Sequence, residues 1–268
     1  MKLKFIAAAV ALLASGSSFA FITGPNDGVA AFGESTELFL SVWQQSATGT
    51  GTVNRSFTFD TGVSVADMQA NKSTNLFINQ VISGSPEWAN FLAAGTATSF
   101  QYNVSGGDKI DVVRDVLLQT YAASTIAVKN NSLLNDALDS MQFYVGAVNA
   151  TGTHGTAANG VSFNTSGDEY FMANGSNNWH GNTGVNSVAV GTAAMFGEMK
   201  KSSDFPGNNT TNTIYAGKML LSQSGSTYSL QYLVPAAPVA AVPEASTYAM
   251  LLGGLGAIGF MARRRKPV

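Results

Sequence analysis

Two apolar segments, one at each end of the chain, limit what this protein can fold into, because both have the composition of targeting segments rather than of a globular core. The first runs without interruption from Phe5 to Ala14. The second runs from Tyr248 to Ala262 and precedes a basic cluster. The folded domain must be built from the roughly 220 residues between them, which is enough for one large domain or two small ones.

The N-terminal segment has the order of a secretory signal peptide. Lys2 and Lys4 precede the apolar run, and Ser18 and Ala20 place small side chains at the −3 and −1 positions of a cleavage site. We therefore expect export by the Sec machinery, with residues 1–20 removed by signal peptidase and Phe21 as the new N-terminus. A short buried helix at the start of a cytosolic domain is the alternative, but it leaves the order of charge, length and small residues unexplained.

The C-terminal segment consists of a short motif, an apolar stretch and a basic stop. The motif is Val242, Pro243 and Glu244. The predicted transmembrane helix, 248–262, has 15 residues and would be about 22 Å long, whereas a bilayer core requires about 20 residues. A helix this short suits a temporary anchor. The basic stop, Arg263, Arg264, Arg265 and Lys266, would remain cytoplasmic, as would the basic N-terminus, so the part between them must cross the membrane.

This tail resembles the PEP-CTERM sorting signal of Gram-negative bacteria that make extracellular polysaccharide. That signal consists of Pro-Glu-Pro, an apolar helix and a basic cluster. Pro243 and Glu244 match the first two motif positions, and Ala245 stands where proline is usual. The resemblance covers residues 242–268. It implies recognition and processing by an exosortase, a membrane-embedded cysteine transpeptidase, followed by a location at the cell surface or outside the cell.

Three other kinds of tail fit less well. A Gram-positive sortase signal requires Leu-Pro-x-Thr-Gly, which the sequence lacks. A glycolipid-anchor signal ends in an apolar rather than a basic stretch. A plain tail anchor leaves the Pro-Glu motif unexplained.

The composition of the exported part excludes nucleic acid as a partner. Between Phe21 and Pro243 the chain has 8 basic and 15 acidic residues, a net charge near −7, which repels phosphate backbones. Cysteine is absent, so stability must come from the core and from hydrogen bonds. Charged residues make up only 11% of the chain, and Ser, Thr, Asn and Gly supply the polarity. Such a neutral polar surface suits contact with hydrated polysaccharide.

The pattern between the ends predicts a mainly β fold, a β-sandwich-like single domain over 21–234 with one or two short helices, followed by a linker over 235–241. Strands are predicted at 36–44, 55–60, 98–104, 213–223 and 226–234, with Gly106-Gly107 ending the third. A helix is predicted from the Ser85 cap to Gly95, and another over 131–149. The apolar run 75–83 is ambiguous.

The sequence predicts no catalytic, cofactor or metal site. A zinc site would need His154 and His180 with Asp168 or Glu169, but two exposed loop histidines are the preferred interpretation. The spacing of Asp108, Asp111 and Asp115 places them on one helix face, where a solvated surface is preferred over calcium binding because the EF-hand spacing is missing. No Gly-x-Ser-x-Gly motif occurs.

Of the three tryptophans, Trp43 and Trp88 fit core positions, and Trp179 is the candidate for stacking on a sugar ring. These observations favour a non-enzymatic surface or matrix protein that is sorted by an exosortase and retained with extracellular polysaccharide. The alternative is a secreted hydrolase that acts on this polysaccharide. It would need two carboxylates about 5–9 Å apart in a cleft.

Overall fold

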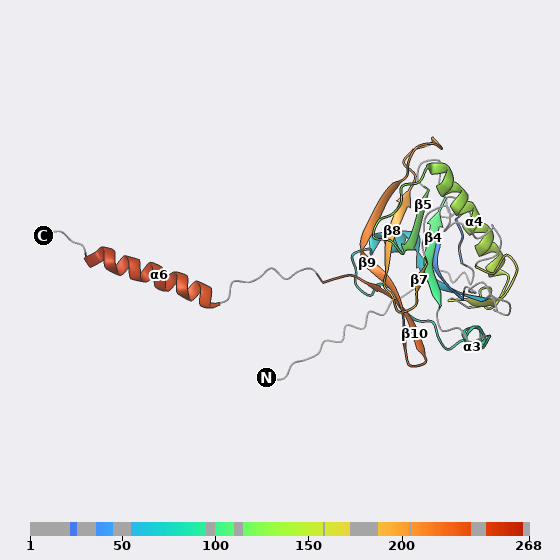
Figure 1. Cartoon of the computed structure of the whole chain (residues 1–268), viewed down its shortest axis with the longest axis horizontal. Helices are drawn as coiled ribbons and strands as arrows, with labels where there is room; N and C mark the ends of the chain where they lie inside the picture. Colours follow the sequence, from blue (N-terminus) through green and yellow to red (C-terminus); the bar gives the residue numbers. More distant parts are fainter. Residues whose placement is uncertain are drawn as a thin grey trace. The chain divides into compact units, whose positions relative to one another are not determined.

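The computed structural model describes residues 22–25, 36–44, 55–94, 100–109, 115–157, 159–171, 187–203, 205–236 and 245–264. The chain divides into two units, one up to Val234 and one from Pro235 onward. The described part of the first unit is an antiparallel sheet with three helices, and that of the second contains one helix, α6 (Figure 1). The predicted signal peptide and its cleavage bond, between Ala20 and Phe21, lie outside the described residues.

The predicted mainly β fold is confirmed. The strands are β1 (Glu37–Gln44), β2 (Arg55–Ser64), β3 (Asn79–Val81), β4 (Gln101–Asp108), β5 (Val116–Tyr121), β6 (Val161–Asn164), β7 (Val188–Ala189), β8 (Ala194–Lys200), β9 (Thr211–Ser224) and β10 (Thr227–Leu233). They form one sheet in the order β3-β10-β9-β8-β5-β4-β1-β2-β6, with β7 paired to β4. The helices of this unit are α2 (Val65–Ala70), α3 (Pro86–Ala93) and α4 (Asn131–Asn149).

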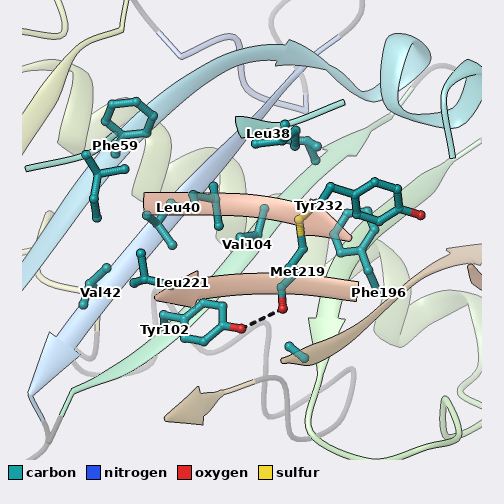
Figure 2. Packing of buried hydrophobic residues seen from close by; sticks show 14 of the residues in the cluster. Leu38, Leu40, Val42, Phe59, Tyr102, Val104, Phe196, Met219, Leu221 and Tyr232 are labelled. Atoms are coloured by element: carbon teal, nitrogen blue, oxygen red, sulfur yellow. Dashed lines mark hydrogen bonds between the residues drawn. The ribbon is translucent and has the colours of Figure 1, made fainter. Parts of the chain in front are cut away.

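The sheet curls, so that strands that are not neighbours face each other. The hydroxyl of Tyr102 on β4 donates to the carbonyl of Met219 on β9 at 2.9 Å, although β5 and β8 separate these strands in the sheet (Figure 2). At the sheet ends, the Gln80 amide on β3 donates to the Thr61 carbonyl on β2 at 2.7 Å. A single curled sheet therefore encloses the first apolar core, where Leu40, Val104, Phe196 and Leu221 lie together with other inward side chains.

Helix α4 covers the outer face of the sheet and forms a second core with it. The Asn130 side chain accepts a hydrogen bond from the Leu133 amide at 2.8 Å and caps the helix. Successive turns of α4 then bury an apolar stripe against the outward side chains of β1, β5 and β8. The stripe is Leu134, Ala137, Leu138, Met141, Tyr144, Val145 and Val148. Both the helix and its bounds, 131–149, agree with the prediction.

Helix α3 lies where the two ends of the curled sheet approach each other. Its start matches the prediction: the Ser85 hydroxyl accepts from the Trp88 amide at 3.0 Å, and Pro86 occupies the first turn. The Trp88 ring contacts Phe57 of β2 and Tyr228 of β10, both with ring centroids 4.8 Å apart. One helix thus joins both sides of the first core.

Two expectations about the middle of the chain are wrong. Gly106 and Gly107 lie within β4 rather than ending it, because the neighbouring chain passes too closely for a side chain: a Cβ at position 106 would lie 2.7 Å from the Leu38 side chain. Asp108 and Asp115 do not share a helix face, because Asp108 ends β4 and Asp115 directly precedes β5. Asp111 lies outside the described residues.

Candidate functional site

The C-terminal unit contains a helix that includes the whole predicted apolar segment, 248–262. Helix α6 spans Ala245–Arg264. Its large apolar side chains are exposed on all sides of the helix, namely those of Met250, Leu251, Leu252, Leu255, Ile258, Phe260 and Met261. Arg263, the first residue of the basic stop, is exposed at its end, and the helix includes Arg264. Val242, Pro243 and Glu244 lie outside the described residues, as do Arg265 and Lys266.

No helix in the described part of the chain combines the length and the apolarity of a membrane span. The predicted transmembrane helix, 248–262, is therefore not confirmed. The four glycines within it lower its hydropathy relative to the same length of leucine and alanine.

In the first unit, two buried ionisable groups with strongly shifted pKa values lie where β2 pairs with β6. His154 is fully buried there, and its Nε2 lies 3.2 Å from the Ser162 hydroxyl. The prediction of an exposed loop histidine is wrong, because the turn that carries His154 folds back onto β6: the Thr153 amide donates to the Val161 carbonyl at 2.8 Å. Gly160 makes room for the ring, since a Cβ there would lie 2.7 Å from the imidazole Nδ1.

Burial shifts the pKa values of His154 and of a nearby carboxyl in opposite directions. Desolvation lowers the pKa of His154 to about 4. Desolvation, and secondarily the charge of Glu37, raises the pKa of Asp60 to about 7, against the opposing effect of a hydrogen bond from the Gly62 amide. Asp60 is fully buried on β2, and its backbone amide donates to the Gly160 carbonyl at 2.9 Å. At neutral pH the protein therefore buries an uncharged histidine and, on β2, a carboxyl near its titration midpoint.

This region contains two features that enzymes also use, a serine hydroxyl beside a histidine and a carboxyl whose pKa a second carboxylate helps to raise, but Asp60, His154 and Ser162 are all fully buried. Ser162 and His154 are both fully buried, whereas a nucleophile and its base must contact substrate. The Asp60 carboxyl accepts from the Gly62 amide at 2.8 Å, and Glu37 accepts from the Thr23 amide at 3.0 Å. These contacts hold both carboxyls against backbone amides, one within β2 and one at the start of β1.

The structure does not bring the described candidate metal ligands together into one site. Within the described ranges, no three His, Asp or Glu side chains lie close enough together to hold a metal ion. Asp168 is exposed, and His180 lies outside the described residues, as does Trp179. Asp108 accepts from the amide of Thr36 at 2.9 Å and from its hydroxyl. Trp43 and Trp88 are buried in the cores, as predicted.

The opposite pKa shifts predict opposite pH dependences for two single variants. His154 is harder to protonate when folded, so its contribution to stability is complete above about pH 6.5 and is lost as the pH falls towards 4. Asp60 is easier to protonate when folded, so its contribution is complete below about pH 4 and is lost as the pH rises through 7. Relative to the wild type, the unfolding free energy of Asp60→Asn should rise between pH 4 and 7 by about 3 kcal/mol, and that of His154→Gln should fall by a similar amount.

Urea denaturation of both variants and the wild type at half-unit pH steps measures this difference. Asp67→Asn is a matched control because Asp67 is an exposed carboxylate at the start of α2. If the unfolding free energy of both variants changes with pH as steeply as that of the wild type, the assigned pKa shifts are wrong.

Comparison with known families identifies the C-terminal segment. The family model described as the PEP-CTERM protein-sorting motif matches residues 241–266. No curated protein and no solved structure matches the chain. The matched range contains the Pro243-Glu244 motif, the apolar segment 248–262 and the whole basic stop. This chain therefore ends in a PEP-CTERM sorting motif, which marks it as an exported protein processed by an exosortase-like membrane enzyme.

Proposed function

We propose that the exported domain is a non-enzymatic surface or extracellular-matrix protein that remains associated with the producing cell's extracellular polysaccharide. The observation that carries this proposal is the sorting motif at residues 241–266, which supports export of the domain, and extracellular polysaccharide would surround an exported domain at the cell surface. The domain itself then needs only to be stable outside the cell and to offer a surface compatible with a hydrated glycan.

The surface of the domain supports this role through its chemistry. Hydroxyl and amide side chains are exposed along the turn before β9 and on the strand itself, including Asn208, Asn209, Thr211 and Thr213. Such groups exchange hydrogen bonds with sugar hydroxyls at low desolvation cost. The net charge near −7 between Phe21 and Pro243 disfavours an ionic mode of binding to acidic glycans, so binding should depend only mildly on salt.

A secreted polysaccharide hydrolase is the second candidate. The raised pKa of Asp60, to which the charge of Glu37 contributes after desolvation, is the observation that favours it, because glycosidases pair a protonated with an ionised carboxyl. The full burial of Asp60 and its hydrogen bond from the Gly62 amide speak against it. An Asp60→Asn variant separates the two functions, since only a hydrolase would lose activity through this change.

Co-sedimentation of the purified protein with the producer's polysaccharide tests the proposal. We expect wild-type protein to bind weakly, with similar affinity at low and high salt. Trp179→Ala should weaken binding by about fivefold, the loss of roughly 1 kcal/mol of stacking. Phe205→Ala is the matched control, because Phe205 is another aromatic residue in the same domain and is 71% exposed.

Each outcome of this assay distinguishes the functions. Absence of binding at every salt concentration would contradict the association with polysaccharide. Reducing sugar ends that accumulate with wild-type protein but not with Asp60→Asn would identify a hydrolase.

A further inference from the structure

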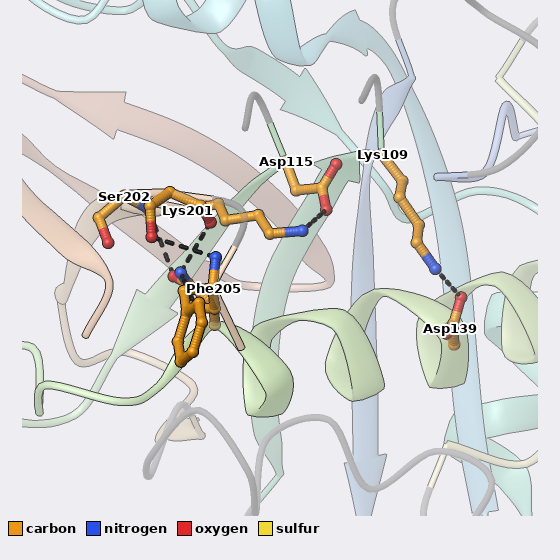
Figure 3. Close-up of polar contacts among 8 residues, drawn as sticks. Lys109, Asp115, Asp139, Lys201, Ser202 and Phe205 are labelled. Carbon is orange, nitrogen blue, oxygen red and sulfur yellow. Dashed lines mark hydrogen bonds and ion pairs between the residues drawn. The ribbon is translucent and has the colours of Figure 1, made fainter. Parts of the chain in front are cut away.

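A buried lysine and a buried aspartate face each other where β5 and β8 pair. Asp115 directly precedes β5 and Lys201 directly follows β8. The Lys201 ammonium Nζ lies 3.3 Å from Oδ2 of Asp115, and the two side chains are only 6% and 3% exposed (Figure 3). The Lys201 backbone amide also donates to the Asp115 carbonyl at 2.9 Å. The sheet itself therefore holds the two side chains in register.

Buried apolar side chains lie next to this pair in the sheet. Leu117 and Met199 lie two residues further along the same two strands, on the same face of the sheet, and both are fully buried in the second core. An ammonium group has three hydrogen-bond donors. Within the part of the chain that the structure describes, Asp115 is the hydrogen-bond partner of the Lys201 ammonium. Desolvation makes such a buried ion pair costly, because its mutual attraction offsets the penalty only when further hydrogen bonds satisfy both groups.

We infer that Lys201 and Asp115 condense to form an intramolecular isopeptide bond. A proton first passes from the ammonium to the carboxylate within the pair. The neutral amine Nζ then attacks the carboxyl carbon of Asp115, a C–N bond forms, and one carboxyl C–O bond breaks. The oxygen leaves as water with two protons from the former ammonium, and the amide nitrogen keeps the third. No oxidant or other reactant is required.

Two features of the molecule favour this reaction. Folding holds the reacting groups in contact, which gives an intramolecular reaction an effective concentration far above that of free groups in solution. The product also replaces two buried charges with one neutral amide, which removes their desolvation cost. The bond would connect β5 and β8 across a sequence separation of 86 residues, in an exported chain that has no cysteine for a disulfide.

Peptide mapping of the exported protein tests this inference. Trypsin cleaves after Arg114, Lys129, Lys200 and Lys218. An amide at Lys201 blocks cleavage at that residue, so residues 115–129 should appear joined to residues 201–218, at the sum of the two masses minus one water. Tandem mass spectrometry should place the branch at Asp115 and Lys201. Recovery of the linear peptides 115–129 and 202–218 alone would overturn the inference.

The chain contains an internal control. Lys109 and Asp139 form a closer pair, 2.6 Å, but their side chains are 29% and 45% exposed (Figure 3). This pair should remain unlinked, and a cross-link there would overturn the argument that burial drives the reaction. Lys201→Arg keeps the positive charge but removes the primary amine, so this variant should yield only linear peptides. A branched peptide that persists in this variant would also contradict the assigned bond.

Discussion

Replacing both Pro243 and Glu244 with alanine is expected to leave the protein in the membrane fraction with its tail still attached. The family model that matches residues 241–266 identifies this region as the signal, and Pro243 and Glu244 are its polar motif. Without the motif, the processing enzyme loses its recognition element, while the exposed apolar side chains of α6 and the basic stop remain to hold the precursor. Fractionation with intact-mass analysis should show that the amount of released protein falls by at least tenfold.

Two single variants serve as controls for this experiment. Pro238→Ala changes a proline that lies outside the matched range, so release should be unaffected. Ala245→Pro restores the Pro-Glu-Pro sequence usual for this signal and should preserve or increase release. If the double alanine variant reaches the same fraction at the same mass as the wild type, the polar motif is not the recognised element.

The elements that sequence predicted well have strong local signals. The 131–149 helix has an apolar stripe and an asparagine cap, and its bounds were correct. The two closing strands flank Gly225 and Ser226, one residue later than the Ser224-Gly225 turn expected from sequence, and Gly225 adopts the positive φ of +60° that a tight hairpin turn favours. The antiparallel pairing of β1 with β2 follows from β-branched and aromatic residues on both sides of a sequence rich in Ser, Thr and Gly. In each case, residues close in sequence determine the conformation.

The elements that were not predicted depend on contacts between distant parts of the chain. Strand β5 is buried along its whole length, because α4 covers one face and the first core covers the other, so it shows no polar alternation. Gly106 and Gly107 suggested the end of a strand. Instead, β1 and α4 pass so close to β4 that only glycine fits at these two positions. The single curled sheet likewise depends on tertiary contacts such as that between Tyr102 and Met219.

The candidate sites also differ in whether they depend on local sequence or on contacts between distant parts of the chain. The sorting motif was predictable because an ordered linear sequence encodes it. The burial of His154 was not, because it depends on a turn that folds back onto β6 and on the missing side chain at Gly160. The pair of Lys201 and Asp115 was missed for the same reason, since the pairing of β5 with β8 joins residues that are far apart in the sequence.

Replacing Trp88 with alanine should destabilise the exported domain by about 3–5 kcal/mol, the usual cost of removing a large buried aromatic side chain. Trp88 is 2% exposed and contacts rings from both sides of the first core, Phe57 on β2 and Tyr228 on β10. Its loss would therefore open a cavity where α3 joins the two ends of the sheet. Because typical domains have only about 5–15 kcal/mol of total stability, the variant should unfold at much lower urea concentration.

Trp88→Phe separates the loss of aromatic packing from the loss of the indole N–H. That N–H is buried and has no hydrogen-bond partner in the described part of the chain, so its removal should cost nothing in hydrogen bonding. Phenylalanine keeps a ring between Phe57 and Tyr228, and we expect a loss of only about 1–2 kcal/mol. Urea unfolding followed by far-UV circular dichroism measures both variants. Equal losses for phenylalanine and alanine would show that the ring contacts do not hold the two ends of the sheet together.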